Sequence, residues 1–405
     1  MSLFANVQPL RLRCGGGAEP GRRATWLELF FDLAFVAAVA QVGTPLGADY
    51  SLAGLARYAF LFLLIWWAWN GHTMFATRFD NDDVVQRLLA LTQIFVVAVM
   101  AVNAKDALDS RSSAGFAAAY AVMRFVLAAQ YVRARQVPES RELATIHAAG
   151  FGLAAACWLV SALIPAPARF WLWGVALAID LGTPIVSARH TLRVPPHAEH
   201  LPERFGLFTI ILLGESLVAI MKGMESQEGW SPAAASSAFL GMAIAFLVWW
   251  WYFHGVSGAA ERAVRTAAQA RRFMVWSFAH LPLYLGIAVA GVGIEHIIRI
   301  APDGHLHGAE IWILCGAAAL FMTSLTTIGA TAELLQEHPA RWRVLAPRYA
   351  ISLLPLAVAA FGSAWPPALQ VAALAAMCFT QLLLAVGSGP GLPEEHRLAP
   401  ANLET

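Results

Sequence analysis

Apolar runs of about 20 residues recur along the whole chain and constrain its fold more than any other feature. A helix needs roughly 20 apolar residues to cross the hydrocarbon core of a bilayer. This length predicts an all-α integral membrane protein with about twelve transmembrane helices. The expected spans are 26–46, 52–76, 84–103, 113–134, 142–164, 168–190, 204–222, 233–256, 272–294, 309–330, 343–363 and 365–387.

The composition supports a membrane protein and excludes several other classes. Of the 405 residues, 59% are apolar and 13% are charged, whereas a soluble domain has about 45–50% and about 25%. The net charge of +1 gives no overall field toward nucleic acid or another acidic partner. The four cysteines show neither metal-site nor redox spacing. A disordered chain, a basic nucleic-acid binder and a small disulfide scaffold are therefore excluded.

The basic residues predict the orientation of the spans. If the N-terminus is cytoplasmic, twenty of the 27 Lys and Arg residues fall in cytoplasmic segments, six fall outside and Arg124 lies within a span. Cytoplasmic loops of membrane proteins carry such an excess of Lys and Arg, so both termini are predicted to be cytoplasmic. Glu28 and Asp32 interrupt the first apolar run, which favours a retained membrane helix over a signal peptide.

Two similar stretches indicate an internal repeat. Tryptophan clusters at 66–69 and 249–251 lie 183 residues apart, and the same offset aligns Asp32 with Glu215. Six spans per half would relate two halves by a two-fold axis along the membrane normal, as in parallel-repeat transporters. A chance match of interfacial tryptophans is the alternative. The predicted segments are a cytoplasmic N-terminal segment at 1–24, a first six-helix half at 25–190, a cytoplasmic linker at 191–203, a second six-helix half at 204–387 and a cytoplasmic tail at 388–405.

Three ionisable residues inside the spans are candidates for transport or proton relay. Asp32 lies about six residues, or roughly 9 Å, into the first span. His72 has a similar depth on the second span, and Glu215 lies near the middle of the seventh. A charge at the bilayer centre costs about 2.5–3.5 kcal/mol unless it is paired or hydrated. Buried carboxylates and imidazoles can change protonation state, as a relay requires. For each of the three residues, the alternative is a role in helix packing.

Arg124 and Asp180 form a second conspicuous set. Each lies halfway along its span, so the two share a depth. Arginine cannot readily lose its proton, so we predict a static buried ion pair. Glu28 is expected to pair with a basic residue near the cytoplasmic interface, with Arg22, Arg23 or Arg78 within reach. No P-loop, Rossmann glycine pattern or HExxH motif occurs, so neither a cofactor nor a metal site is predicted.

Two segments carry a family resemblance. The first span reads Thr25-Trp-Leu-Glu-Leu-Phe-Phe-Asp-Leu-Ala-Phe-Val36, and the seventh opens with Glu203-Arg-Phe-Gly-Leu-Phe-Thr-Ile-Ile-Leu-Leu-Gly-Glu-Ser216. Together with 69–72, 78–80 and Asp83, they resemble the bacterial low temperature requirement A family over residues 22–390. The resemblance implies a multi-pass protein of the bacterial inner membrane, linked by name to growth in the cold, and implies no biochemical activity. The residues assigned to the motif are Glu28, Phe31, Asp32, Asn70, Gly71, His72, Glu203, Arg204, Gly214, Glu215 and Ser216.

These observations favour a secondary transporter or an ion or proton pathway that uses buried acids. Its predicted partners are the lipid bilayer and a small ion or solute, not nucleic acid. One alternative is a membrane-embedded lipid-modifying enzyme. The candidate cluster of catalytic groups for such an enzyme is His72, Asp80 and Asp83 near the cytoplasmic face. Another is a structural or sensory membrane protein whose buried polar residues hold the helices together.

Overall fold

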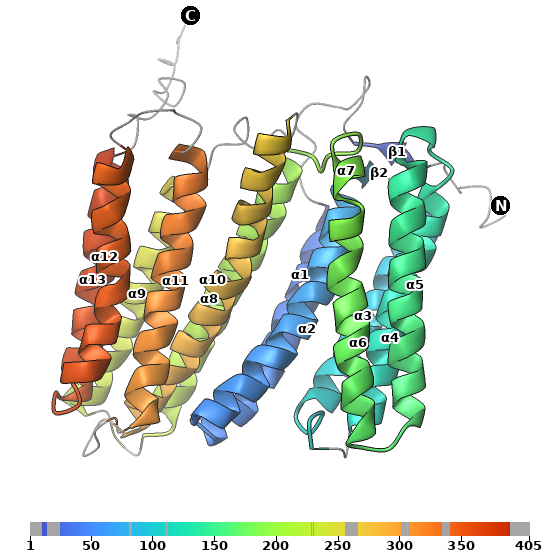
Figure 1. The fold of residues 1–405 in the computed structure, drawn as a ribbon. Helices are drawn as coiled ribbons and strands as arrows, with labels where there is room; N and C mark the ends of the chain where they lie inside the picture. The colour runs from blue at the N-terminus through green and yellow to red at the C-terminus, as the bar shows by residue number, and fades with distance from the viewer. Residues whose placement is uncertain are drawn as a thin grey trace, which may run out of the picture.

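The computed structural model describes residues 10–13, 25–80, 83–109, 112–227, 229, 231–255, 266–300, 306, 308–333 and 341–388. Within these ranges, twelve helices are long and apolar enough to cross a membrane. Helices that follow one another along the chain run in opposite directions through the bundle (Figure 1). The prediction of an all-α protein with about twelve transmembrane helices is confirmed.

Six of these helices precede the predicted linker, and the first three of them begin at a side-chain cap. The hydroxyl of Thr25 caps the first helix, the hydroxyl of Ser51 caps the second, and the carboxylate of Asp83 caps the third. These side chains satisfy backbone N–H groups that have no partner within the helix. The helices are α1 (Trp26–Ala48), α2 (Leu52–Ala76), α3 (Val84–Ala104), α4 (Ser113–Ala134), α5 (Arg141–Leu163, after the 3-10 turn η2 at Pro138–Ser140) and α6 (Ala168–Val186).

Two of the remaining helices, α8 (His200–Glu225) and α10 (Ala267–Ile300), extend beyond their predicted spans at both ends. The predicted span 272–294 is part of a helix of 34 residues, about 51 Å long at 1.5 Å per residue. Charged residues end an apolar run without ending the backbone hydrogen bonding of the helix. Hydropathy therefore underestimates the length of such helices. The elements are α7 (Ala188–Thr191), α8 (His200–Glu225), α9 (Pro232–Gly255), α10 (Ala267–Ile300), α11 (Ala309–Glu333), α12 (Arg341–Phe361) and α13 (Pro367–Ser388).

A short strand pair lies at the end of the bundle where α1 begins (Figure 1). Strand β1 (Arg11–Leu12) runs antiparallel to β2 (Phe79–Asp80), with Arg11 opposite Asp80 and Leu12 opposite Phe79. Leu10 and Phe79 are buried in a small apolar cluster with Tyr131 of α4. Two-residue strands have no detectable period, so the sequence did not predict them.

Helices α1 and α2 lie at the centre of the bundle, between α3–α6 on one side and α8–α13 on the other (Figure 1). Helix α1 packs against α8 and α10, and α2 contacts α8, α10 and α11. In chain order, the helices fall into two sets, α1–α6 and α8–α13. Buried side chains from both sets, including Phe35, Trp69 and Phe208, belong to one core cluster. The junction between the two sets is therefore packed through its middle.

The outer surface of the bundle is apolar. Phe95, Leu163 and Phe361 are 70%, 81% and 82% exposed. Leaving such a side chain in water instead of burying it costs about 1.5–3 kcal/mol, and many others on this surface are similarly exposed. Lipid removes this cost, so the surface is that of a multi-pass membrane protein.

Candidate functional site

Asp32 lies almost two turns into α1 and is completely buried. The start of the helix is held by a capping box, in which Thr25 and Glu28 each accept the other's backbone N–H. The Asp32 carboxylate accepts hydrogen bonds from Nε1 of Trp69 at 2.7 Å, and from Nε and Nη2 of Arg204 at 3.0 and 2.5 Å. Two parallel bonds from one guanidinium make this a bidentate, charge-assisted pair. It joins α1 to α8.

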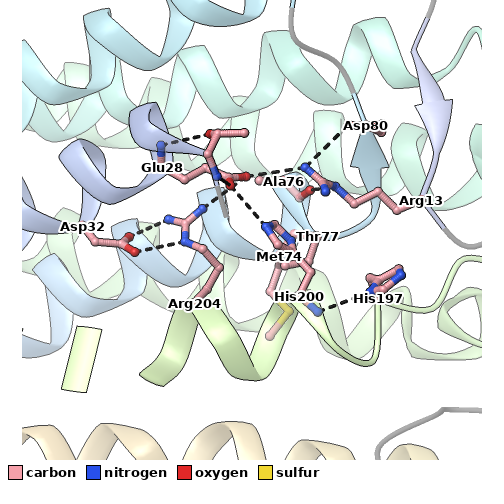
Figure 2. Close-up of polar contacts among 11 residues, drawn as sticks. Arg13, Glu28, Asp32, Met74, Ala76, Thr77, Asp80, His197, His200 and Arg204 are labelled. Carbon is pink, nitrogen blue, oxygen red and sulfur yellow. Dashed lines mark hydrogen bonds and ion pairs between the residues drawn. The ribbon is translucent and has the colours of Figure 1, made fainter. Parts of the chain in front are cut away.

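Glu28 extends this ion pair toward the predicted cytoplasmic end. Its carboxylate lies 3.2 Å from Nε2 of His200, 3.5 Å from Nη1 of Arg204 and 3.6 Å from Nη2 of Arg13. Figure 2 shows the Glu28 carboxylate between Arg13 on one side and Arg204 and His200 on the other. A buried guanidinium needs close compensation, and two carboxylates one turn apart on α1 supply it to Arg204.

Arg13 ties the segment before α1 to this cluster. Its Nε donates to the backbone oxygen of Ala76 at 2.8 Å, and its Nη2 lies 3.6 Å from the Asp80 carboxylate. Its backbone N–H donates to the oxygen of Arg78 at 2.9 Å. These contacts hold β1 against the end of α2, directly beside Glu28 (Figure 2).

His72 is buried at a different point from the Asp32 ion pair. Its ring stacks on Phe31 with centroids 4.0 Å apart, and no hydrogen bond joins it to Asp32. Its Nδ1 has no hydrogen-bond partner among the described residues. His72, Glu28 and Arg13 line a cavity of about 40 Å³, which has room for an ordered water. The similar depth of His72 and Asp32 along their spans is therefore not accompanied by a hydrogen bond or ion pair between them in the described structure.

Glu215 lines a larger cavity of about 400 Å³ between α1, α8 and α10, called here the outer cavity. Its α1 wall consists of small residues that include Ala40, Gly43 and Gly47. On α8, the Glu215 carboxylate lies 4.0 Å from Nζ of Lys222, and the two side chains are 29% and 55% exposed. This ion pair is loose and accessible, unlike the one at Asp32.

The Asp32 ion pair and the outer cavity are separated along the helices. Arg204 meets Asp32, and Glu215 lies eleven residues further along α8, about 16 Å at 1.5 Å per residue. The 183-residue offset therefore does not bring the two acids to one depth. The three predicted relay residues, Asp32, His72 and Glu215, form no continuous hydrogen-bonded chain in the described structure.

A layer of buried aromatic rings fills the space between them. The floor of the outer cavity is formed by Val39, Leu212 and Ala288. One turn closer to the predicted cytoplasmic end, the same helices carry Phe35, Phe208 and Tyr284, which are all fully buried. The Trp69 ring lies 4.5 Å from that of Phe208, and the Tyr284 hydroxyl donates to the oxygen of Phe205 at 2.8 Å. One further turn down lies the layer that contains Asp32 and Arg204.

Arg124 and Asp180 come together inside the first set of helices. Nε of Arg124 lies 2.8 Å from the Asp180 carboxylate, and both side chains are fully buried. The Tyr120 hydroxyl accepts a hydrogen bond from Nη2 of Arg124 at 2.6 Å. The guanidinium also lies over the Tyr120 ring, 4.8 Å from its centroid, where a cation is attracted by the π-system. The pair links α4 to α6.

Sequence reasoning missed Arg204 as the partner of Asp32. The expected span begins at Arg204, which places this residue with the basic residues of the cytoplasmic loop. The helix begins four residues earlier, at His200, so Arg204 lies one turn inside it. Arg78, a predicted partner of Glu28, donates instead to the backbone oxygen of Val194 at 3.2 Å, and the other two, Arg22 and Arg23, lie outside the described residues.

Comparison with known families shows to which protein family the chain belongs. Residues 23–386 match the model of the bacterial low temperature requirement A protein. The chain belongs to the bacterial low temperature requirement A family. An uncharacterized protein of Rhizobium meliloti (strain 1021) is 34% identical over 288 residues, which cover 67% of this chain and 68% of that protein. In this low temperature requirement A protein, the matched region contains the Asp32 ion pair and the outer cavity.

The other residues that carry the family resemblance lie around these sites and the Arg124 ion pair. A Cβ added to Gly71 would lie 3.0 Å from Nη1 of Arg124. The Ser216 hydroxyl donates to the oxygen of Leu212 at 3.3 Å, and Ser216 packs against Gly291, where an added Cβ would lie 3.0 Å from its Oγ. Of the remaining residues, Asn70 is buried, Glu203 is half-buried and nothing lies within 4 Å of a Cβ added to Gly214.

Proposed function

We propose that this protein is a secondary transporter whose outer cavity receives the transported solute or ion. The observation that carries the proposal is the position of that cavity. It opens between the two sets of helices and stops one turn above the buried aromatic layer, with the Asp32–Arg204 pair one turn below that layer. A cavity that ends above a closed layer of side chains is what a carrier caught in one of its two states presents.

The order of helix packing supports two six-helix repeats. In each set, the first helix packs on the second and third, and the third, fourth, fifth and sixth pack in succession. The correspondence is α1–α6 with α8–α13. Twelve spans with basic loops on the side of α1's start support cytoplasmic termini and the bacterial inner membrane. The outer cavity would then face away from the cytoplasm.

In this proposal, the Asp32–Arg204 pair is the cytoplasmic gate. Its two residues lie on α1 and α8, the first helix of each repeat, so rocking of one repeat against the other would separate them. Separated buried charges need water, and the small cavity beside His72 and Glu28 is where cytoplasmic water would reach them. Glu215 would contact the solute or ion in the outer cavity. His72 would contact it when it is released toward the cytoplasm.

The lipid-enzyme alternative has less support. The Asp83 carboxylate caps α3 and forms an ion pair with Arg133, and Asp80 lies beside Arg13. The third member of the predicted cluster, His72, stacks on Phe31. His72 and Asp80 both line the small cavity, but Asp83 does not, and each of the three groups is engaged in a separate structural contact.

The proposal is tested by measuring how accessible introduced cysteines are to thiol reagents. This test requires no knowledge of the substrate. In a background that lacks the native cysteines, Ala40→Cys reports on the outer cavity and Ala90→Cys on the small cavity. We expect a membrane-impermeant thiol reagent added outside to label Ala40→Cys. Adding Arg204→Gln should open the gate, slow that labelling, and speed labelling of Ala90→Cys from the cytoplasmic side. Arg57→Gln, in an exposed pair with Asp109, is the matched control.

Unchanged labelling at both positions in the Arg204→Gln variant would contradict the gate. It would favour the structural or sensory alternative, in which the buried ion pair only holds helices together. A proton-flux assay in liposomes then separates a proton pathway from other transport. Asp32→Asn and Glu215→Gln should lower proton flux only if these acids carry protons.

A further inference from the structure

The outer cavity has an ordered arrangement of charge on two of its walls. On α8, Glu215 precedes Lys222 by seven residues, and on α10, Glu295 precedes Arg299 by four. These separations are about 10 and 6 Å along the helix axes. Both helices run from the Asp32 layer toward the predicted outer end, so on each wall the acid is the deeper group and the base lies nearer the mouth.

The direction of α10 relative to α1 follows from its contacts. Tyr284 reaches the backbone of Phe205 near the Asp32 layer, whereas Val292 lies 3.7 Å from a Cβ built on Gly43 and 3.9 Å from one built on Gly47. Helices α1, α8 and α10 therefore run in the same direction through this part of the bundle. On both walls the acid therefore lies beneath the base, and the two contact each other: Arg299 forms an ion pair with Glu295, and Lys222 lies 4.0 Å from Glu215.

We propose that the outer cavity binds a small zwitterion, with its ammonium group toward Glu215 and Glu295 and its carboxylate toward Lys222 and Arg299. This proposal rests on the proposed function and names the substrate class of the same site. Two acids and two bases attract a ligand without net charge, and their order selects its direction. The loose Glu215–Lys222 pair, 4.0 Å apart and partly exposed, can exchange its internal contact for contacts to the ligand. On α10, the ligand would have to replace the ion pair between Arg299 and Glu295, in which the Arg299 side chain is 46% exposed.

The remainder of the cavity suits a small amino acid. Its volume of about 400 Å³ lies within the roughly 300–1,000 Å³ typical of small-molecule sites. Val39, Leu212 and Ala288 form an apolar floor, on which an apolar side chain loses contact with water. A free α-amino acid with an apolar side chain combines this floor with the two charge layers.

The charge order also argues against a lipid headgroup with the same chemistry. Phosphatidylethanolamine is a zwitterion, but its phosphate is linked to the acyl chains and its ammonium lies at the far end. In the outer leaflet, its anionic group would therefore lie deeper than its ammonium. In the cavity, Glu215 and Glu295 lie deeper than Lys222 and Arg299, so the lipid would meet like charges at both layers.

Calorimetric titration of the full chain in phosphatidylglycerol nanodiscs tests the proposal. The probes are L-alanine and L-leucine, with propylamine and propionate carrying one charge each. We expect the amino acids to bind about tenfold or more tightly than either single-charge probe, a difference of about 1.4 kcal/mol or more. Glu215→Gln and Lys222→Gln should each weaken amino-acid binding by a similar factor. Lys222→Arg keeps the cation and should retain binding.

Two further variants separate the charge order from general effects. Glu215→Lys with Lys222→Glu keeps the composition and inverts the order, so it should not restore binding. Glu225→Gln changes an exposed acid on the same helix beyond the cavity and should bind as the wild type does. Glu215 and Lys222 are partly exposed, and an unchanged elution profile verifies that their variants fold.

Four results would overturn the proposal. Neither amino acid binds; propylamine or propionate binds as tightly as the amino acids; or Glu215→Gln and Lys222→Gln bind like the wild type. In the fourth, phosphatidylethanolamine nanodiscs abolish amino-acid binding, which would identify a lipid headgroup site. Accessibility changes without amino-acid binding would leave the carrier intact and remove this ligand class. Binding with unchanged accessibility would indicate a receptor instead.

Discussion

Replacing Arg204 by methionine should strongly destabilise the protein because it leaves Asp32 as an unpaired buried charge. Both side chains are fully buried, and of the described side chains that donate to the Asp32 carboxylate, Trp69 would remain. Two unit charges about 4 Å apart at an effective dielectric constant of 20 attract by about 4 kcal/mol. Measured losses on breaking a buried pair are about 3–5 kcal/mol, so we expect a loss in this range.

A double-mutant cycle with Asp32→Asn separates the ion pair from other effects of Arg204→Met. Asparagine keeps the shape and can still accept from Trp69. Asp32→Asn alone leaves Arg204 within 3.5 Å of Glu28, so it should cost less than Arg204→Met. In the double variant neither charge remains at these two positions. Its loss should be smaller than the sum of the two single losses by about 3 kcal/mol.

The assay is the free energy of unfolding in mixed micelles titrated with sodium dodecyl sulfate. The exposed pair Arg57–Asp109, whose side chains are 57% and 49% exposed, provides the control. Arg57→Met should cost about 0–1 kcal/mol. Additive losses in the Asp32 and Arg204 cycle, or an Arg204→Met loss no larger than that of Arg57→Met, would refute the reasoning.

Three other changes have defined outcomes. Arg124→Met should lower the free energy of unfolding by about 3–5 kcal/mol, with part of the loss recovered by adding Asp180→Asn; full additivity would contradict a working ion pair. Gly71→Ala should lower it by about 1–3 kcal/mol because the new Cβ would lie 2.8 Å from a neighbouring side chain, whereas Gly152→Ala, where nothing lies within 4 Å, should not; equal effects in unfolding titrations would refute this. Burial and the nearby histidine of α8 lower the pKa of His197, so the unfolded chain binds more protons and stability falls as the pH drops through the ordinary histidine range. Melting curves between pH 7.5 and pH 5.5 should therefore shift less in His197→Asn than in the wild type, and identical shifts would exclude a contribution from this histidine.

The helices could be predicted from sequence because one physical requirement dominates them. Each must present about 20 apolar residues to lipid, and this signal does not depend on its neighbours. The strand pair β1–β2 and the ends of α10 could not be predicted. Their positions depend on backbone pairing and on charged residues, such as Arg299, that lie beyond the apolar run.

The site was predictable only where depth alone selects the partners. Arg124 and Asp180 share a depth in their spans, and the structure brings them to 2.8 Å. Asp32 and Arg204 are 172 residues apart on helices whose contact depends on how the two sets of helices pack. The outer cavity arises from small side chains, and the spacing of Ala40, Gly43 and Gly47 along one face of α1 is the signal that could have indicated it.

The two buried ion pairs have the same chemistry but different positions in the fold. Arg124 and Asp180 join α4 to α6, within one set of helices, so movement of that set as a rigid body would leave their contact unchanged. Arg204 and Asp32 join α8 to α1, across the junction between the sets, so the same movement must break their contact. Replacing a buried ion pair by apolar residues is often neutral or stabilising, so stability alone does not account for an ion pair at a packed junction. Its charges can be hydrated when the junction opens, which an apolar contact of the same area cannot match, and this property suits a contact that opens and closes.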